Sequence, residues 1–254
     1  MLKIIQIPLL SDNYSYLIID KATKTSACVD PADSEGVIKV LKNYDIGLDY
    51  ILNTHHHNDH TGGNLELKKK YGCKIIGCYA DQHRIPGIDI KLNDKETFNI
   101  GHSSLIVIET PGHTVGHICF YFRDQHILFS GDTLFSLGCG RLFEGSFEEM
   151  TESILKIRSL PKETKIYCGH EYTESNASFA NYLDKRDFLL KKKIIEIKDK
   201  RSKSIPTVPF LLEEEMKLNP FLKFDNIEYL DTINLDNVTK VENFKKIRLM
   251  KDNF

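Results

Sequence analysis

The chain has 254 residues, of which 34 are basic and 36 acidic, and 41% of its residues are hydrophobic. This length and apolar share suit one large domain, or one domain with a smaller one, built around a real core. The formal net charge of -2 provides no overall basic field for nucleic acid or an anionic membrane, so we expect neither as a partner.

The first part of the chain alternates apolar runs with turn residues. Short strands are predicted at residues 4–7, 15–19 and 27–29. Gln6 and Pro8 interrupt the first run and no small-residue cleavage site follows, which favours a strand over a targeting segment. No stretch approaches the ~20 apolar residues that cross a bilayer. We therefore expect a cytoplasmic protein.

The hydrophobic period then changes to that of a helix. A helix is predicted from Ser34, with an apolar face that runs to Tyr44 and a stop at Gly47. A second helix follows the Gly62-Gly63 pair. Further strands are predicted at residues 50–52, 74–76, 97–100, 105–108, 117–122, 127–129 and 165–167, and a further helix at 147–159.

Beyond Tyr172 the composition becomes polar and rich in lysine. Residues 174–203 are predicted to be helical, and no strand-like alternation is recognised after them. The sequence therefore predicts an α+β fold with two domains. We expect a metal-binding catalytic domain at residues 1–172 and a mostly helical domain at 173–254.

Residues 53–64, N-T-H-H-H-N-D-H-T-G-G-N, concentrate imidazole and carboxylate groups directly after an apolar run. These nitrogen and oxygen donors suit zinc and similar divalent ions, and their short spacing lets several converge on one point. Three more apolar runs end in a turn and a donor, namely His113, Asp132 and His170. Strands that end in this way gather donors at one edge of a sheet, where a ligand commonly binds.

Four motifs in this order, T-H-H-H-N-D-H, P-G-H-T, S-G-D-T and C-G-H-E-Y, resemble the metallo-β-lactamase superfamily over about two thirds of the chain. G-C-G-R-L-F-E-G at 138–145, Y-C-G-H-E-Y-T at 167–173, N-P-F at 219–221 and the C-terminal R-L-M-K-D-N-F extend the resemblance to the glyoxalase II family over nearly the whole chain. The resemblance implies an αββα sandwich followed by a mostly helical domain that binds glutathione.

The resemblance also implies a binuclear metal site with a divalent ion in each half. The implied ligands are His55, His57 and His113 for the first ion, Asp59, His60 and His170 for the second, and Asp132 as the bridge, with Asp59 and Asp132 counted as catalytic. Zinc is the expected metal, and iron and manganese are alternatives because the same donors accept all three. Two such ions ~3.5–4 Å apart can share a hydroxide that acts as the nucleophile.

Five residues match the positions at which the resembled family binds glutathione: Arg141, Phe143, Tyr172, Arg248 and Lys251. Arginine and lysine suit the carboxylates of this anionic tripeptide. Phe143 departs from the family's tyrosine and cannot donate a hydrogen bond, so we expect somewhat weaker substrate binding. The implied activity is hydrolysis of S-(2-hydroxyacyl)glutathione, such as S-D-lactoylglutathione, to a 2-hydroxy acid such as D-lactate and glutathione, the second step of methylglyoxal detoxification.

Other interpretations remain open at this point. The same scaffold could carry a mononuclear iron persulfide dioxygenase, a non-catalytic metal or glutathione-conjugate binding protein, or a nuclease. We interpret five histidines as surface or core residues: His56, His83, His102, His117 and His126. The six cysteines show no C-x-x-C pair and are expected to be buried free thiols. A monomer is favoured.

Overall fold

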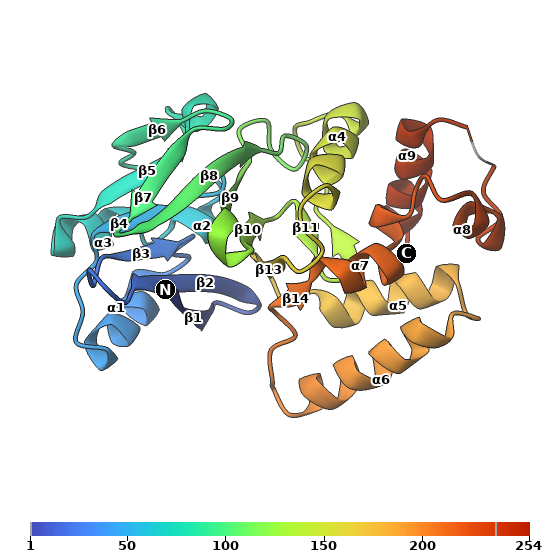
Figure 1. Ribbon diagram of the computed structural model, residues 1–254, viewed down its shortest axis with the longest axis horizontal. Coiled ribbons are helices and arrows are strands. Elements are labelled where there is room, and N and C mark those ends of the chain that lie inside the picture. Colours follow the sequence, from blue (N-terminus) through green and yellow to red (C-terminus); the bar gives the residue numbers. More distant parts are fainter. Residues whose placement is uncertain (1, 237) are drawn as a thin grey trace.

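Two six-stranded sheets form the centre of the structure, a computed structural model that describes residues 2–236 and 238–254 (Figure 1). The first sheet has the order β1-β2-β3-β4-β5-β6, with the bounds Leu2–Leu9, Asn13–Asp20, Ser26–Val29, Tyr50–Leu52, Lys74–Cys78 and Ile90–Leu92. The second has the order β14-β13-β10-β9-β8-β7, with the bounds Phe210–Leu211, Lys165–Cys168, Ile127–Gly131, Ile118–Phe122, Ser103–Glu109 and Thr97–Ile100. A separate ribbon pairs β11 (Leu134–Phe135) with β12 (Gly138–Cys139).

Alternate residues of the first sheet enter different cores, as the two-residue period of a strand requires. On β2, Leu17 packs in the cluster that contains α1 (Ser34–Asn43) and α3 (Asn64–Tyr71), whereas Ile18 packs in the cluster shared with the second sheet. Ile51 and Leu52 divide in the same way on β4. Both faces of this sheet are therefore covered, by helices on one side and by the second sheet on the other.

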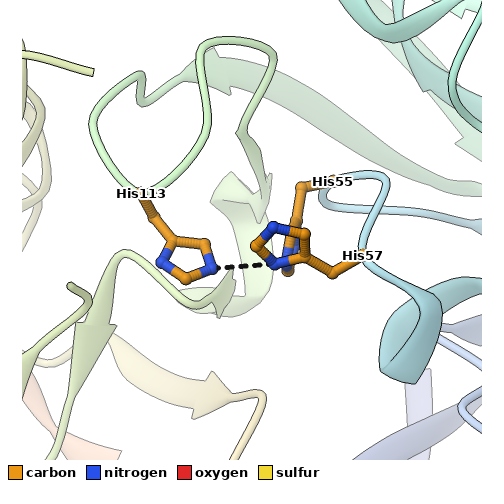
Figure 2. Close-up of side chains that lie close together, drawn as sticks. All are labelled: His55, His57 and His113. Carbon is orange, nitrogen blue, oxygen red and sulfur yellow. Dashed lines mark hydrogen bonds between the residues drawn. The ribbon is translucent and has the colours of Figure 1, made fainter. Parts of the chain in front are cut away.

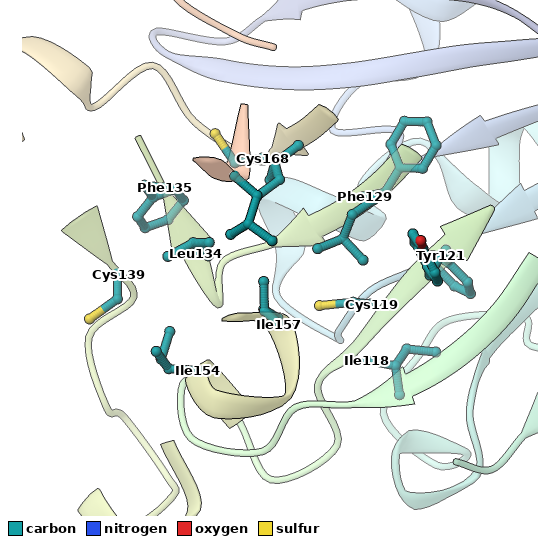
Figure 3. Close-up of a cluster of buried hydrophobic side chains, with 14 of the residues drawn as sticks. Ile118, Cys119, Tyr121, Phe129, Leu134, Phe135, Cys139, Ile154, Ile157 and Cys168 are labelled. Atoms are coloured by element: carbon teal, nitrogen blue, oxygen red, sulfur yellow. The ribbon is translucent and has the colours of Figure 1, made fainter. Parts of the chain in front are cut away.

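Helix α4 (Phe147–Arg158) belongs to the core of the second sheet. Its residues Ile154 and Ile157 lie in one buried cluster with Ile118 and Cys119 of β9 (Figure 3). The helix begins with a capping box, in which the Ser146 side chain accepts from the Glu149 backbone and the Glu149 side chain accepts from the Ser146 backbone. The predicted αββα sandwich is confirmed.

The C-terminal part is mostly helical, as expected, and differs from the prediction in two details. Its helices are α5 (Thr173–Leu183), α6 (Phe188–Ser202), α7 (Leu212–Leu218), α8 (Ile227–Thr232) and α9 (Lys240–Asp252). The helical run predicted at 174–203 is broken into α5 and α6, because Asp187 caps a new helix by accepting from the Leu190 backbone. A strand does return, since β14 pairs antiparallel with β13.

Other element boundaries also differ from those predicted. Helix α1 ends at Asn43, so Tyr44 is an exposed cap residue and Gly47 lies outside the helix. The short strands β6, β11 and β12 were not predicted. A four-residue helix, α2 (Asn58–Thr61), lies within the histidine-rich segment.

All six cysteines are buried and unpaired, as expected. In the described part of the chain, no helix combines the length and the apolar character that a membrane crossing requires.

Glu215 of α7 connects the C-terminal helices to the β11–β12 ribbon. Its buried carboxylate accepts from the Leu137 backbone (2.6 Å), the Ser136 hydroxyl (2.9 Å) and the Asn219 amide (3.0 Å). Burial raises the pKa of Glu215 to about 7, although these three donors oppose the shift. The folded chain therefore holds this proton more tightly than the unfolded chain does.

We predict that the free energy of unfolding falls as the pH rises from about 4.5 to about 7. The contribution of protonated Glu215 is complete below the ordinary pKa of about 4.5 and is lost as the pH passes the folded pKa of about 7. Between pH 5 and pH 7 the wild-type chain should lose roughly 2 kcal/mol more than Glu215→Gln, which cannot ionise. Urea unfolding of both proteins in the same metal-loaded state measures this difference, and parallel pH profiles would contradict it.

Candidate metal centre

Four strand ends deliver the predicted metal ligands to one place. In the first sheet, β4 leads into the segment that carries His55, His57 and, on α2, Asp59 and His60. In the second sheet, β8, β10 and β13 run in the same direction, because β10 and β13 are parallel and β9 is antiparallel to both β8 and β10. The turns after these three strands carry the remaining ligands, which face the first sheet.

Three imidazoles form the first half of the centre (Figure 2). His57 Nδ1 lies 3.0 Å from His55 Nε2 and 3.1 Å from His113 Nε2. Imidazole nitrogens this close together, on rings that point toward one another, are arranged as ligands around a divalent cation are. A bound cation would take the place of their direct contact.

The second half contains Asp59, His60 and His170. The Nε2 atoms of the two histidines are 3.3 Å apart. Asp59 Oδ2 lies 3.6 Å from His60 Nε2 and 3.4 Å from His170 Nε2. This half is therefore a mixed site of two nitrogens and one oxygen.

Asp132 lies between the two halves. Its Oδ2 is 3.5 Å from His113 Nε2 and 3.3 Å from His170 Nε2, and its Oδ1 is 3.5 Å from His60 Nε2. Oδ1 is buried and accepts no hydrogen bond from the described residues. A buried carboxylate oxygen without a partner is costly, and cations coordinated by the surrounding donors would remove that cost. The residues present thus fit a divalent metal centre.

The pKa shifts follow from burial and from these contacts. Burial disfavours the ionised form of Asp132, but the neighbouring His60 and His170 outweigh it and hold the pKa well below its usual range. Burial, reinforced by neighbouring imidazoles, lowers the pKa of His55 well below its ordinary value. Burial favours the neutral form of His60, but Asp132 and Asp30 outweigh it and raise the pKa of His60 well above its ordinary value. An ionised carboxylate and a neutral imidazole are the forms that bind metal, so metal binding at His60 would displace a proton.

Hydrogen bonds from the first sheet orient two of the histidines. Asp30 Oδ2 lies 3.1 Å from His60 Nδ1 and accepts from the Thr54 hydroxyl at 2.7 Å, and that hydroxyl lies 3.0 Å from His55 Nδ1. Asp30 is itself buried. A partner on the far nitrogen fixes both the tautomer and the ring orientation of a ligand.

The β1–β2 turn and the first residue of β2 orient ligands of the second half. Asp12 Oδ1 lies 2.7 Å from His170 Nδ1, and the Asn13 amide donates to Asp59 Oδ2 at 3.0 Å. These orienting residues were not identified from the sequence, because each lies far along the chain from the ligand that it contacts.

His117 also has a role that the sequence did not reveal. It is buried, and its Nε2 accepts from the backbone N–H of Asp132 at 3.1 Å. Its Nδ1 lies 2.9 Å from the Thr110 hydroxyl and 3.0 Å from the Thr133 hydroxyl, so Nδ1 carries the proton. His117 is thus a core residue, as interpreted, that also supports the turn bearing Asp132.

Two glycines allow the turns after β10 and β13 to lie close to the ligand side chains. A Cβ on Gly169 would lie 2.7 Å from His60 Cε1 and even closer to Asp132 Oδ1. Gly131 has a φ of +47° and faces Thr54 and His117, so a side chain there would meet both strain and collision.

An open cavity of about 490 Å³ extends from the predicted metal ligands to the C-terminal helices. It is lined by five of the seven predicted metal ligands and by all five residues expected to bind substrate, namely Arg141, Phe143, Tyr172, Arg248 and Lys251. The structure therefore brings the two predicted sets of site residues together in one hollow.

These lining residues differ in how firmly they are held. Arg141 is 68% exposed, whereas Arg248 is buried and donates to the Cys139 carbonyl at 3.0 Å and to Asp252 at 2.8 Å. The Tyr172 ring stacks on His170 with centroids 4.7 Å apart. Lys251 Nζ donates to the Ser175 carbonyl at 3.3 Å.

Comparison with known proteins agrees with this geometry. A family model described as "Metallo-beta-lactamase superfamily" matches residues 12–170, and one described as "Hydroxyacylglutathione hydrolase C-terminus" matches residues 171–254. The hydroxyacylglutathione hydrolase of Methylococcus capsulatus is 47% identical, with 100% of this chain and 99% of that protein covered. That of Pelagibacter ubique is also 47% identical, with 96% and 97% covered.

The solved structure of ETHE1 from Myxococcus xanthus shares the fold, with a TM-score of 0.68, 22% identity and coverage of 97% of this chain and 98% of that one. Both family models, the full-length relatives and the His/Asp groups lead to the same conclusion. The chain belongs to the metallo-β-lactamase superfamily and, within it, to the hydroxyacylglutathione hydrolases.

Proposed function

We propose that the protein hydrolyses S-(2-hydroxyacyl)glutathione thioesters, such as S-D-lactoylglutathione, to a 2-hydroxy acid and glutathione. The observation that carries this proposal is the cavity that joins the His/Asp groups to Arg141, Arg248 and Lys251. The full-length hydroxyacylglutathione hydrolase relatives support the choice of substrate.

The proposed centre holds two divalent ions. His55, His57 and His113 would bind one, Asp59, His60 and His170 the other, and Asp132 both; zinc is our choice of metal. When bound, the ions would supply an acidified water and polarise the thioester carbonyl. A thiolate is a good leaving group because thiols ionise near pH ~8.5, so the chain needs no strong general acid.

The remaining cavity residues would recognise the glutathione portion. Glutathione carries two carboxylates and one ammonium, and Arg141, Arg248 and Lys251 would supply the complementary positive charge. We assign the metal ligands, together with Arg141, Phe143 and Tyr172, to a domain at residues 1–172, and the substrate contacts of Arg248 and Lys251 to one at 173–254. The two family models, which meet between residues 170 and 171, support this division.

The direct test follows loss of the thioester of S-D-lactoylglutathione by purified, metal-loaded protein, with and without a chelator. A coenzyme A thioester of the same acid serves as the matched substrate, because it shares the acyl group and lacks glutathione. We expect rapid, chelator-sensitive hydrolysis of the glutathione ester alone. Absence of hydrolysis from protein shown to carry metal would overturn the proposal.

Metal analysis separates this proposal from the persulfide dioxygenase alternative. Two ions per chain favour hydrolysis. One iron per chain, with oxygen consumed in the presence of glutathione persulfide, would favour the dioxygenase instead.

Asp132→Ala should lower both metal content and turnover. The substitution removes the only carboxylate that lies within 3.5 Å of both halves among the described residues, so turnover should fall about a hundredfold or more. Elemental analysis and steady-state kinetics measure the two effects. Asp124→Ala, an exposed aspartate in the short 3-10 helix Arg123–Gln125, is the matched control. Normal metal content with normal turnover in Asp132→Ala would exclude the bridging role.

Lys251→Ala and Arg248→Ala should have separable effects. Each removes a cavity cation, so each should raise KM about tenfold and leave metal content intact. Arg248→Ala should also lower the free energy of unfolding by about 2 kcal/mol, because it abolishes the charged hydrogen bond to the Cys139 carbonyl.

Kinetics and thermal unfolding of both variants, beside Lys246→Ala on the same helix, measure these effects. Lys246 lines a different hollow and should leave KM unchanged. An unchanged KM in Lys251→Ala would remove this lysine from the substrate site.

A further inference from the structure

Phe143 lies at the mouth of the cavity, on the segment between β12 and α4. Its ring is 5.1 Å from that of His113 and 5.9 Å from that of His57, between centroids, and 59% of the residue is exposed. A side chain so placed lies beside the metal ligands without binding metal. Its position therefore depends on what holds the segment.

Backbone contacts attach this segment to the His113 turn. The Phe143 N–H donates to the His113 carbonyl at 3.2 Å, and the Gly145 N–H donates to the Gly112 carbonyl at 3.0 Å. The two strips of backbone are in direct contact, because a Cβ on Gly145 would lie 2.6 Å from Gly112 Cα.

Glu144 adds two side-chain connections. Its Oε2 accepts from the Val115 N–H at 2.9 Å, which reinforces the attachment to the His113 turn. Its Oε1 accepts from Arg84 Nη1 at 2.6 Å and lies 3.6 Å from His56 Nε2. Arg84 and His56 follow strands of the first sheet, so Glu144 connects the rim segment to the opposite half of the sandwich.

Asp81 completes the network of Glu144, Arg84 and His56. It is fully buried, and its Oδ1 accepts from Arg84 Nε at 3.0 Å and also from Arg84 Nη2. Its Oδ2 lies 3.2 Å from His56 Nδ1. Gly116 makes room for it, since a Cβ there would collide with the Asp81 carboxylate. Asp81 thus fixes the Arg84 guanidinium in a position from which it donates to Glu144.

We propose that Arg84 and Glu144, fixed by Asp81 and His56, are positioning residues that hold Phe143 against the substrate and so determine substrate affinity. The inference rests on the proposed function for the identity of the substrate. None of the four residues is a proposed metal ligand. The network holds the segment that bears Phe143, and the same segment meets a proposed ligand at Arg141, whose carbonyl lies 2.8 Å from His113 Nδ1.

Glu144→Gln is the variant that tests the connection. The glutamine oxygen can still accept from Val115, but its amide group faces the donors of Arg84. We expect KM for S-D-lactoylglutathione to rise about tenfold, while kcat stays within about threefold and metal content is unchanged. Glu152→Gln on α4, exposed and of the same charge, is the matched control. Equal KM values for Glu144→Gln and wild type would overturn the proposal.

A double-mutant cycle with Phe143→Ala distinguishes positioning from a general structural effect. If Glu144 acts through Phe143, Glu144→Gln should add little to the KM of Phe143→Ala. Full additivity of the two substitutions would show that Glu144 does not act through this ring, and would overturn the proposal.

Hydrogen exchange provides a readout that does not depend on the reaction. The N–H groups of Phe143 and Gly145 should exchange at least about tenfold faster in Glu144→Gln than in wild type, whereas peptides of β9 should be unchanged. If wild type fails to cleave the thioester, this exchange still decides whether the network holds the rim. Faster exchange without thioesterase activity would reject the proposed function alone, and unchanged exchange would reject the positioning role.

Discussion

The buried carboxylate of Asp132 is the constraint around which the rest of the site is arranged. Its Oδ2 lies 3.5 Å from His113 Nε2 and its Oδ1 lies 3.5 Å from His60 Nε2, and Oδ1 has no hydrogen-bond partner among the described residues. Burial of such a charge is tolerable only where opposite charge is concentrated. Converging strand ends, close-packed glycines and orienting hydrogen bonds all place donors around this one group.

Both sheets are needed to build this arrangement. The first sheet provides a loop with four proposed ligands, and Asp30 near the end of β3 orients His60 of that loop. The second sheet provides its three ligands from turns after strands that run in the same direction. Packing of the two sheets through a shared apolar core therefore sets the distance between the two halves of the centre.

Local patterns in the sequence predicted the strand-rich and helical parts and the donor residues, whereas the αββα sandwich and the division of the ligands between two ions were implied by the family resemblance. Short spacing in T-H-H-H-N-D-H, and a donor directly after each apolar run, can be recognised without tertiary contacts. The roles of His117 and Glu215 could not be predicted, since the first depends on the Asp132 turn and the second on Ser136, 79 residues away. The two-residue strand β14 was missed because it has no hydrophobic period of its own and is defined by its pairing with β13.

The residues proposed to bind metal are held more firmly in this molecule than those proposed to bind substrate. The proposed metal ligands lie mostly below the surface and have orienting partners, whereas Arg141 and Phe143 stand at an open mouth and are 68% and 59% exposed. Exposed side chains can change with little cost in stability, while a change beneath them would leave a buried charge unpaired. The network of Arg84 and Glu144 lies between these two regions. It therefore gives the rim a defined geometry without adding any group to the metal centre.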